Sequence, residues 1–177
     1  RYPLAMSFLQ MGKYTQALEE INVALAAVPA IDTPQKQELT FWKGICEMQD
    51  KEYETARKSL EVFLTIFPPG ADRNANYAVS NPAIQKVPEA RLLIGTCLLL
   101  DEKYKEAAAY YSKVKGSLNP VNRGRATVLE LYALLEADDN EGALKLVMEE
   151  YPHMGDLLQL VTFQTLTLEL GSRLLEK

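Results

Sequence analysis

The feature of this sequence that most constrains its fold is a short unit that recurs along the chain. In this unit an alanine follows a tyrosine by three residues, and it occurs at residues 14–17, 53–56 and 104–107. A weaker fourth copy, at residues 139–143, has Asn140 where the tyrosine is expected. Recurrence at intervals of a few tens of residues is typical of repeat proteins, in which each repeat buries its apolar face against its neighbours.

Each unit opens an amphipathic helical run, and a second helical run precedes it. The preceding runs are predicted at residues 4–11, 38–49, 89–100 and 126–136. Two such runs form an antiparallel pair, helix A followed by helix B, with the tyrosine filling the wedge between them. A larger residue at the alanine position would force the helices apart. We therefore expect Ala17, Ala56 and Ala107 to be buried where helix A meets helix B.

Prolines mark the expected ends of helix B. Pro29, Pro68 and Pro120 each follow a unit, and proline cannot continue the hydrogen-bond ladder of a helix. The interval between the second and third units is the longest, and its extra residues fall at 69–87, a stretch rich in Pro, Gly, Asn and Ser. Such a stretch predicts an inserted loop. The loop carries apolar residues that predict partial order, namely Tyr77, Val79, Ile84 and Val87.

These features resemble the tetratricopeptide repeat family, in which helix A carries a Leu-Gly pair and helix B carries Gly-x-Tyr-x2-Ala and a closing Pro. The third copy fits best, with Ile94, Gly95, Tyr104 and Ala107 among its matching positions. The resemblance implies an all-α fold. It would be a right-handed α-solenoid of antiparallel helix pairs, a tetratricopeptide-like superhelix of about nine helices.

The implied organisation is a single repeat domain over residues 1–177. Its repeats are placed at residues 1–32, 37–68, 88–120 and 121–152, with the inserted loop at 69–87. Residues 156–177 are expected to form helix A of a fifth repeat or a capping helix, because Leu170, Gly171 and Leu174 follow the helix A pattern.

Composition and charge argue against several functions. The net charge is −5, and no run is rich in Lys or Arg, so nucleic acid is not an expected partner. The longest apolar run, residues 92–100, is shorter than the roughly 20 residues of a bilayer span, so no direct membrane insertion is expected. The only histidine, His153, follows Pro152 and is expected in a loop. Without a nucleophile–base set, phosphate loop or metal motif, we expect no enzyme activity, cofactor or metal.

The two cysteines have a structural interpretation. Cys46 and Cys97 each follow a glycine of helix A by two residues, so they occupy the same slot in successive repeats. The corresponding residues in the other repeats are also small, Ser7 and Ala133. Equivalent slots in stacked helix pairs are too far apart for a disulfide. Both cysteines are expected to be reduced core residues.

The resemblance also implies where a partner binds, because helix A lines the concave face of such proteins. The predicted groove takes three residues from each of the second, third and fourth repeats: Phe41, Ile45, Met48, Leu92, Thr96, Leu99, Val128, Tyr132 and Leu135. The basic set that clamps a peptide carboxylate does not occur at these positions. The expected ligand is instead an apolar peptide or an amphipathic helix.

The leading interpretation is a non-catalytic scaffold that binds a protein or peptide partner. Residues 88–95, Pro-Glu-Ala-Arg-Leu-Leu-x-Gly, are similar to helix A of bacterial envelope-assembly proteins, a generic resemblance that fixes neither the partner nor the compartment. The alternative is a regulatory or sensor module of a larger protein. In that case the groove would be filled by the insert, by the C-terminal helix or by further repeats.

Overall fold

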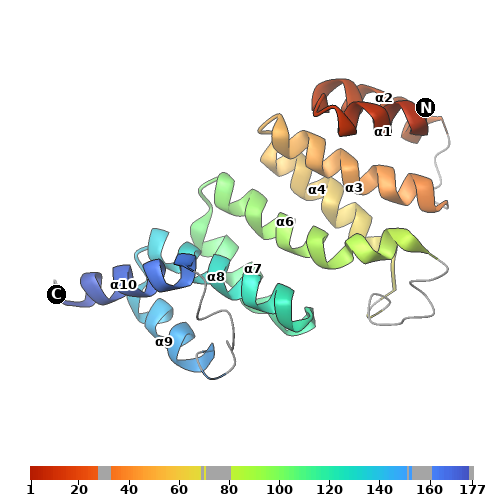
Figure 1. The fold of residues 1–177 in the computed structure, drawn as a ribbon. Helices are drawn as coiled ribbons and strands as arrows, with labels where there is room; N and C mark the ends of the chain where they lie inside the picture. Colours follow the sequence, from red (N-terminus) through yellow and green to blue (C-terminus); the bar gives the residue numbers. More distant parts are fainter. Residues whose placement is uncertain (28–32, 69, 71–80, 151, 153–160, 176–177) are drawn as a thin grey trace. The chain divides into compact units, whose positions relative to one another are not determined.

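The computed structural model describes residues 1–27, 33–68, 70, 81–150, 152 and 161–175, and these ranges contain helices and turns but no strand. Nine α-helices form the regular structure of the described ranges (Figure 1), which confirms the predicted all-α class. The chain divides into two compact units, Arg1–Asp101 and Glu102–Lys177.

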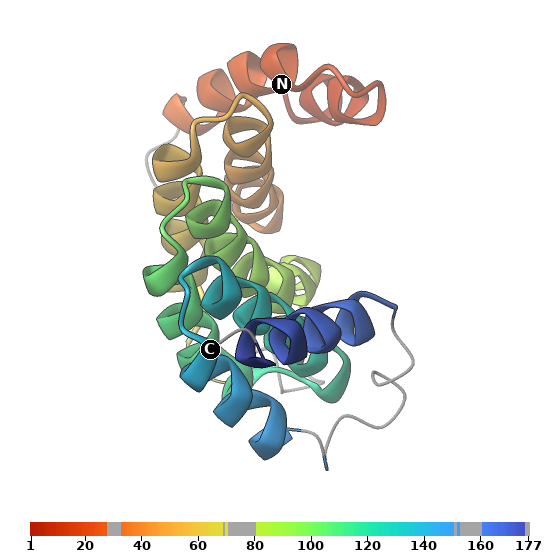
Figure 2. The ribbon, with the colours of Figure 1, turned by 90° about the vertical axis from the view of Figure 1, so that its left-hand side faces the viewer.

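The first unit contains helices α1 (Tyr2–Gln10), α2 (Tyr14–Ala26), α3 (Pro34–Gln49), α4 (Tyr53–Thr65) and α6 (Val87–Leu100), with a 3-10 helix η2 (Pro82–Lys86) before α6. Successive helices are neighbours, since α1 packs on α2, α2 on α3, α3 on α4, and α4 on α6. Figure 2 shows the α1–α2 hairpin, in red, above the α3–α4 hairpin, in brown. This is the packing of consecutive helical hairpins.

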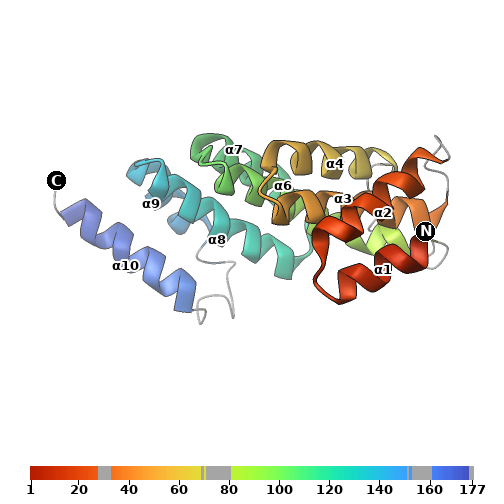
Figure 3. The same ribbon diagram turned by 90° about the horizontal axis from the view of Figure 1, so that it is seen from above.

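The second unit contains α7 (Tyr104–Val114), the 3-10 helix η3 (Lys115–Ser117), α8 (Pro120–Glu136), α9 (Asn140–Glu150) and α10 (Val161–Leu175). Helix α8 packs against both α7 and α9, and α10 packs against α8 and α9 (Figure 3). The helix predicted at 156–177 therefore corresponds to α10. Residues 153–160, 176 and 177 lie outside the described residues.

Three hairpin turns share one geometry. The second residue after helix A has a positive φ, 69° at Gly12, 65° at Lys51 and 57° at Asp138. In each turn the following residue donates its backbone N–H to the carbonyl five residues earlier, at 2.9 Å. This is the αL termination of a helix, which satisfies carbonyl groups of its last turn. Equivalent turns make the hairpins structurally equivalent even where their sequences differ.

Small residues allow the helices of a pair to cross closely. Ala17, Ala56 and Ala107 are all fully buried, as the repeat pattern predicted. At the crossing of α3 and α4, a Cβ added to Gly44 would lie 2.7 Å from Cγ of Leu60 and 3.3 Å from the carbonyl oxygen of Ala56. The α3–α4 contact therefore depends on the absence of a side chain at Gly44.

The prediction that Pro120 ends a helix is wrong. Pro120 is the first residue of α8, and the side chain of Asn119 accepts a hydrogen bond from the N–H of Asn122 at 2.9 Å. Helix α3 begins in the same way, with Pro34 after a Thr33 cap. Proline suits this first position because its missing N–H would have no partner there. Both helices therefore start earlier than the sequence analysis placed them.

Of the other two predicted helix ends the structure describes one, and it describes only part of the insert. Helix α4 ends at Thr65, shortly before Pro68, whereas Pro29 lies outside the described residues. In the insert, residues 71–80, which include Tyr77 and Val79, also lie outside them. Residues 82–86 form η2, in which Ile84 is buried, and the buried Val87 begins α6.

Candidate functional site

Four of the nine predicted groove residues lie in the core. Phe41 is 1% exposed, and Leu92, Leu99 and Leu135 are also buried. Phe41 packs against Phe63 of α4, with 5.5 Å between ring centroids, so it faces its own helix B. These four side chains can contact a partner only if the hairpins repack.

The other five predicted residues keep accessible surface. Ile45, Met48, Thr96 and Val128 are half-buried, and Tyr132 is 38% exposed. Ile45, Thr96 and Tyr132 are the middle residues of their three predicted triplets. The middle position therefore keeps some accessible surface in all three helices, α3, α6 and α8. Ile45 and Thr96 belong to the first unit and Tyr132 to the second.

In the first unit, the carboxylate of Glu38 joins groups from three elements. The hydroxyl of Tyr2 in α1 donates to Oε2 at 2.7 Å, and Nε1 of Trp42 in α3 donates to Oε1 at 3.4 Å. Nζ of Lys86 in η2 lies 3.5 Å from Oε1. The hydrogen bond to Glu38, together with burial, raises the pKa of Tyr2 to about 12. The sequence analysis missed this cluster because its members lie far apart along the chain.

The end of the insert covers part of α3. Nζ of Lys86 lies 5.3 Å from the ring centroid of Phe41 and 5.0 Å from that of Trp42, within cation–π range. Nδ2 of Asn81 donates to Oε1 of Gln37 at 2.6 Å. These contacts occupy the N-terminal half of α3. Ile45 and Met48 lie on its C-terminal half.

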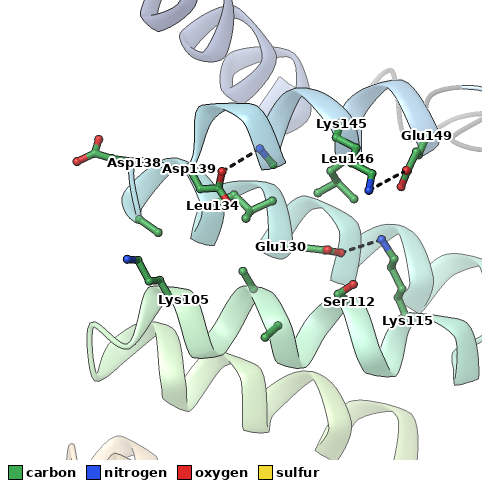
Figure 4. A pocket seen from close by; sticks show the side chains of 14 residues that line it. Lys105, Ser112, Lys115, Glu130, Leu134, Asp138, Asp139, Lys145, Leu146 and Glu149 are labelled. Atoms are coloured by element: carbon green, nitrogen blue, oxygen red, sulfur yellow. Dashed lines mark hydrogen bonds and ion pairs between the residues drawn. The ribbon is translucent and has the colours of Figure 1, made fainter.

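In the second unit, a pocket of about 740 Å³ lies between α7, α8 and α9 (Figure 4). Its apolar lining residues include Ala108, Ala109, Leu134 and Leu146, and its charged ones include three lysines and four acidic residues. The sequence analysis did not predict this pocket, because it depends on how α9 sits against α8 rather than on any local motif.

Several charged groups around the pocket have structural partners. Nζ of Lys115 lies 2.9 Å from Oε2 of Glu130, and Nζ of Lys145 lies 3.8 Å from Oε1 of Glu149 (Figure 4). Oδ1 of Asp139 accepts a hydrogen bond from the N–H of Gly142 at 2.9 Å, near the start of α9. These carboxylates therefore hold helices in place, and the pairs give the pocket a mixed rather than a single-sign charge.

The Lys115 pair extends into a partly buried ionic cluster. Nζ of Lys115 also lies 3.3 Å from Oε1 of Glu150, and Nη2 of Arg123 lies 3.1 Å from each oxygen of the same carboxylate. Burial raises the pKa of Glu130, although Lys115 opposes this. Burial also acts to raise the pKa of Glu150, but Arg123 and Lys115 outweigh it and the net shift is downward. The cluster ties η3 and α8 to the end of α9.

The cysteines lie where the repeat slot predicted. Cys46 and Cys97 are free and buried, and Ala133 in the same slot is buried as well, whereas Ser7 in α1 is exposed. Burial raises the pKa of Cys46 to about 12 and that of Cys97 to about 11. Both thiols are therefore protonated and unreactive at neutral pH.

The described residues contain neither a cluster of metal-ligating side chains nor a membrane-spanning helix. No group of three or more His, Cys, Asp or Glu in these ranges is arranged to hold a metal ion. No helix in the same ranges combines the length and apolar character needed to cross a membrane. His153 lies outside the described residues.

One protein-family model matches part of the chain. The sequence model of the tetratricopeptide repeat family matches residues 2–71, which include the two helix pairs α1–α2 and α3–α4. Comparison with curated proteins gives no match.

Proposed function

We propose that the chain is a non-catalytic scaffold that binds an apolar peptide or an amphipathic helix, a proposal supported by the match of residues 2–71 to the tetratricopeptide repeat family. Tetratricopeptide repeats generally mediate protein–protein interaction, and their stacked helices offer extended binding surfaces.

The observation that carries the proposal is the accessible middle position of helix A. Ile45, Thr96 and Tyr132 keep accessible surface, whereas the residues four positions earlier in α3 and α6 are core residues. Folding leaves part of the apolar surface of Ile45 and of Tyr132 exposed to water. A partner that covers these side chains removes the remaining apolar surface from water, and this burial favours binding.

The alternative is a regulatory module whose own insert fills part of the surface. The contacts of Lys86 with Phe41 and Trp42, and of Asn81 with Gln37, favour this alternative for the N-terminal half of α3. We therefore limit the proposed partner site in the first unit to the C-terminal half of α3. Under the alternative, displacement of η2 would uncover the two aromatic rings.

The test compares two charge-introducing variants of the whole chain with wild type. Ile45→Glu combined with Tyr132→Glu should weaken partner capture from source cells by at least about tenfold, because an interface side chain that matters contributes more than about 1 kcal/mol. Both side chains keep accessible surface, so the variant should stay folded, which circular dichroism checks. Phe41 and Leu99 are unsuitable for this purpose because a charge at either would disrupt the core.

The matched control is Val62→Glu. Val62 lies in α4, a helix B, and is 46% exposed. This variant introduces one negative charge, against two in the test variant, at an apolar surface position outside the proposed site, so it should capture partners as wild type does. Equal capture by all three proteins, or loss of capture in the Val62 variant alone, would rule out the helix A surface as the binding site.

A further inference from the structure

A carboxylate and an aromatic ring lie side by side on the face of α3 that carries Ile45. Glu38, Trp42 and Ile45 are spaced by four and three residues, so they lie along one stripe of the helix. All three side chains are half-buried, and 25% of the Glu38 side chain is exposed. The stripe therefore runs from the helix A surface proposed above to a partly accessible carboxylate about two turns away.

Lys86 places a cation over this part of the stripe. Its Nζ lies 5.0 Å from the ring centroid of Trp42, 5.3 Å from that of Phe41, and 3.5 Å from Oε1 of Glu38. An ammonium group near aromatic faces and a carboxylate is attracted by both kinds of group. The side chain that occupies the site thus indicates the class of ligand that the site accepts.

The carboxylate of Glu38 is held in place without Lys86. The hydroxyl of Tyr2 donates to Oε2 at 2.7 Å, and Nε1 of Trp42 donates to Oε1 at 3.4 Å. These bonds come from α1 and from α3 itself, so they remain when Lys86 points elsewhere. The site is therefore an acceptor that is preorganised for an incoming cation.

Lys86 fits the site loosely. The 3.5 Å between Nζ and Oε1 exceeds the roughly 2.7–2.9 Å of a well-formed bond between an ammonium group and a carboxylate. The Lys86 side chain is also 26% exposed, and partly exposed pairs of this kind contribute little to stability. Its backbone is anchored, because Ala83 and Ile84 of η2 are buried. The side chain alone has to rotate into solvent for the site to open.

We propose that Glu38 and Trp42 form a binding site for the side-chain ammonium group of a lysine from a partner protein, with Lys86 as an internal competitor. The partner's ammonium group would donate to Oε1 of Glu38 and lie against the ring of Trp42. Tyr2 acts as a positioning residue for the carboxylate. The stripe predicts that a partner bound along α3 carries this lysine beside its apolar segment; that last step rests on the proposed function, whereas the lysine site does not.

The probe for this site is N-acetyl-lysine methylamide, and Trp42 reports its binding. Because Trp42 is the only tryptophan, its indole N–H gives a single NMR signal. In Lys86→Met, which keeps a long side chain without the charge, the probe should shift this signal saturably. Wild type should bind at least about tenfold more weakly, because its site is free only in the molecules whose Lys86 points to solvent.

Three controls test the chemistry of the site. The Nε-acetyl form of the probe carries no charge and should not bind. Glu38→Gln added to Lys86→Met should weaken probe binding at least about tenfold, because it removes the charge of the acceptor. Lys58→Met, which removes a 67% exposed lysine of α4, should bind the probe as wild type does. The probe has no apolar segment, so this site and the helix A surface can each fail alone.

Circular dichroism checks that Lys86→Met, and Lys86→Gln as a second variant, are folded. Absence of a saturable shift in the folded variants, equal binding by wild type, or binding that survives Glu38→Gln would overturn the proposal. Unfolding of both variants would also overturn it, because Lys86 would then be required by the fold and could not be exchanged for a ligand.

Carbodiimide crosslinking separates a lysine of a protein from a free amine. The reagent joins a carboxylate to a nearby amine as an amide, so in wild type it should link Glu38 to Lys86. In Lys86→Met, treated in an extract of source cells, mass spectrometry should find Glu38 linked to a lysine of another protein. Adducts of Glu38 with small amines alone would overturn the assignment to a protein partner.

Discussion

Alanine substitutions at Gly44 and Gly171 should have opposite effects on stability, although the two glycines hold the same position in their helices. Within a helix, alanine is favoured over glycine by about 0.5–1 kcal/mol. At Gly171 the new methyl group meets nothing within 4 Å, so the variant should gain this amount. At Gly44 the methyl group would lie 2.7 Å from Leu60, a fully buried residue.

The expected magnitude follows from the packing around Gly44. Leu60 has no open space to move into, because it lies in the core between α3 and α4. Inserting a methyl group into such a core costs about 1–3 kcal/mol. The gain in helix propensity offsets up to about 1 kcal/mol of this. Gly44→Ala should therefore destabilise the first unit by up to about 2 kcal/mol, and the two substitutions should differ by about 1–3 kcal/mol.

Urea unfolding with two probes measures this difference. Trp42, the only tryptophan, lies in α3 and reports on the first unit, while circular dichroism reports on all helices. Gly44→Ala should lower the urea midpoint seen by fluorescence, and Gly171→Ala should leave that midpoint unchanged. A fluorescence midpoint that rises for Gly44→Ala would refute the close crossing of α3 and α4, because the gain in helix propensity would then meet no packing cost.

Three further predictions concern the two cysteine thiols, the hydrogen bond between Tyr2 and Glu38, and the helix crossing at Ala56. Cys46 and Cys97 should resist alkylation at neutral pH in the folded chain and react fully in denaturant; rapid labelling without unfolding would contradict their burial. Glu38→Gln should lower the pKa of Tyr2 from about 12 toward its usual value, as followed by phenolate absorbance, and a titration identical to wild type would refute the hydrogen bond. Because the folded-state pKa is raised, the stabilisation from Tyr2 is complete below about pH 10 and is lost as the pH rises toward 12. Ala56→Leu should destabilise the first unit by about 1–3 kcal/mol, and an unchanged melting temperature would contradict its placement.

The sequence was most informative where a single residue type determines a contact. An alanine or glycine at a helix crossing is required by the space available, so Ala56 and Gly44 could be placed from the repeat pattern alone. Proline was more ambiguous, because the same residue can follow a helix or begin one. At Pro34 and Pro120 the preceding residues, Thr33 and Asn119, cap a helix N-terminus, so each of these prolines begins a helix.

The predicted groove was harder to place because helix A has more than one apolar side. One side packs against its own helix B and another against the preceding hairpin, so an apolar residue in helix A does not by itself indicate an open surface. Phe41 and Leu92 are buried, whereas Ile45 keeps accessible surface. The contact of Lys86 with Trp42 could not be predicted from local pattern, since it joins residues distant along the chain.

The helix A proposal is tested most directly by photocrosslinking from a single position. Benzoylphenylalanine would replace Ile45 in the full chain, with Val62 as the control position, and crosslinks formed in source cells would be mapped by mass spectrometry. The account predicts that position 45 crosslinks to an apolar or amphipathic segment of another protein and that position 62 does not. Crosslinks from position 45 confined to residues 69–87 of the chain itself, or the same partners at both positions, would contradict it.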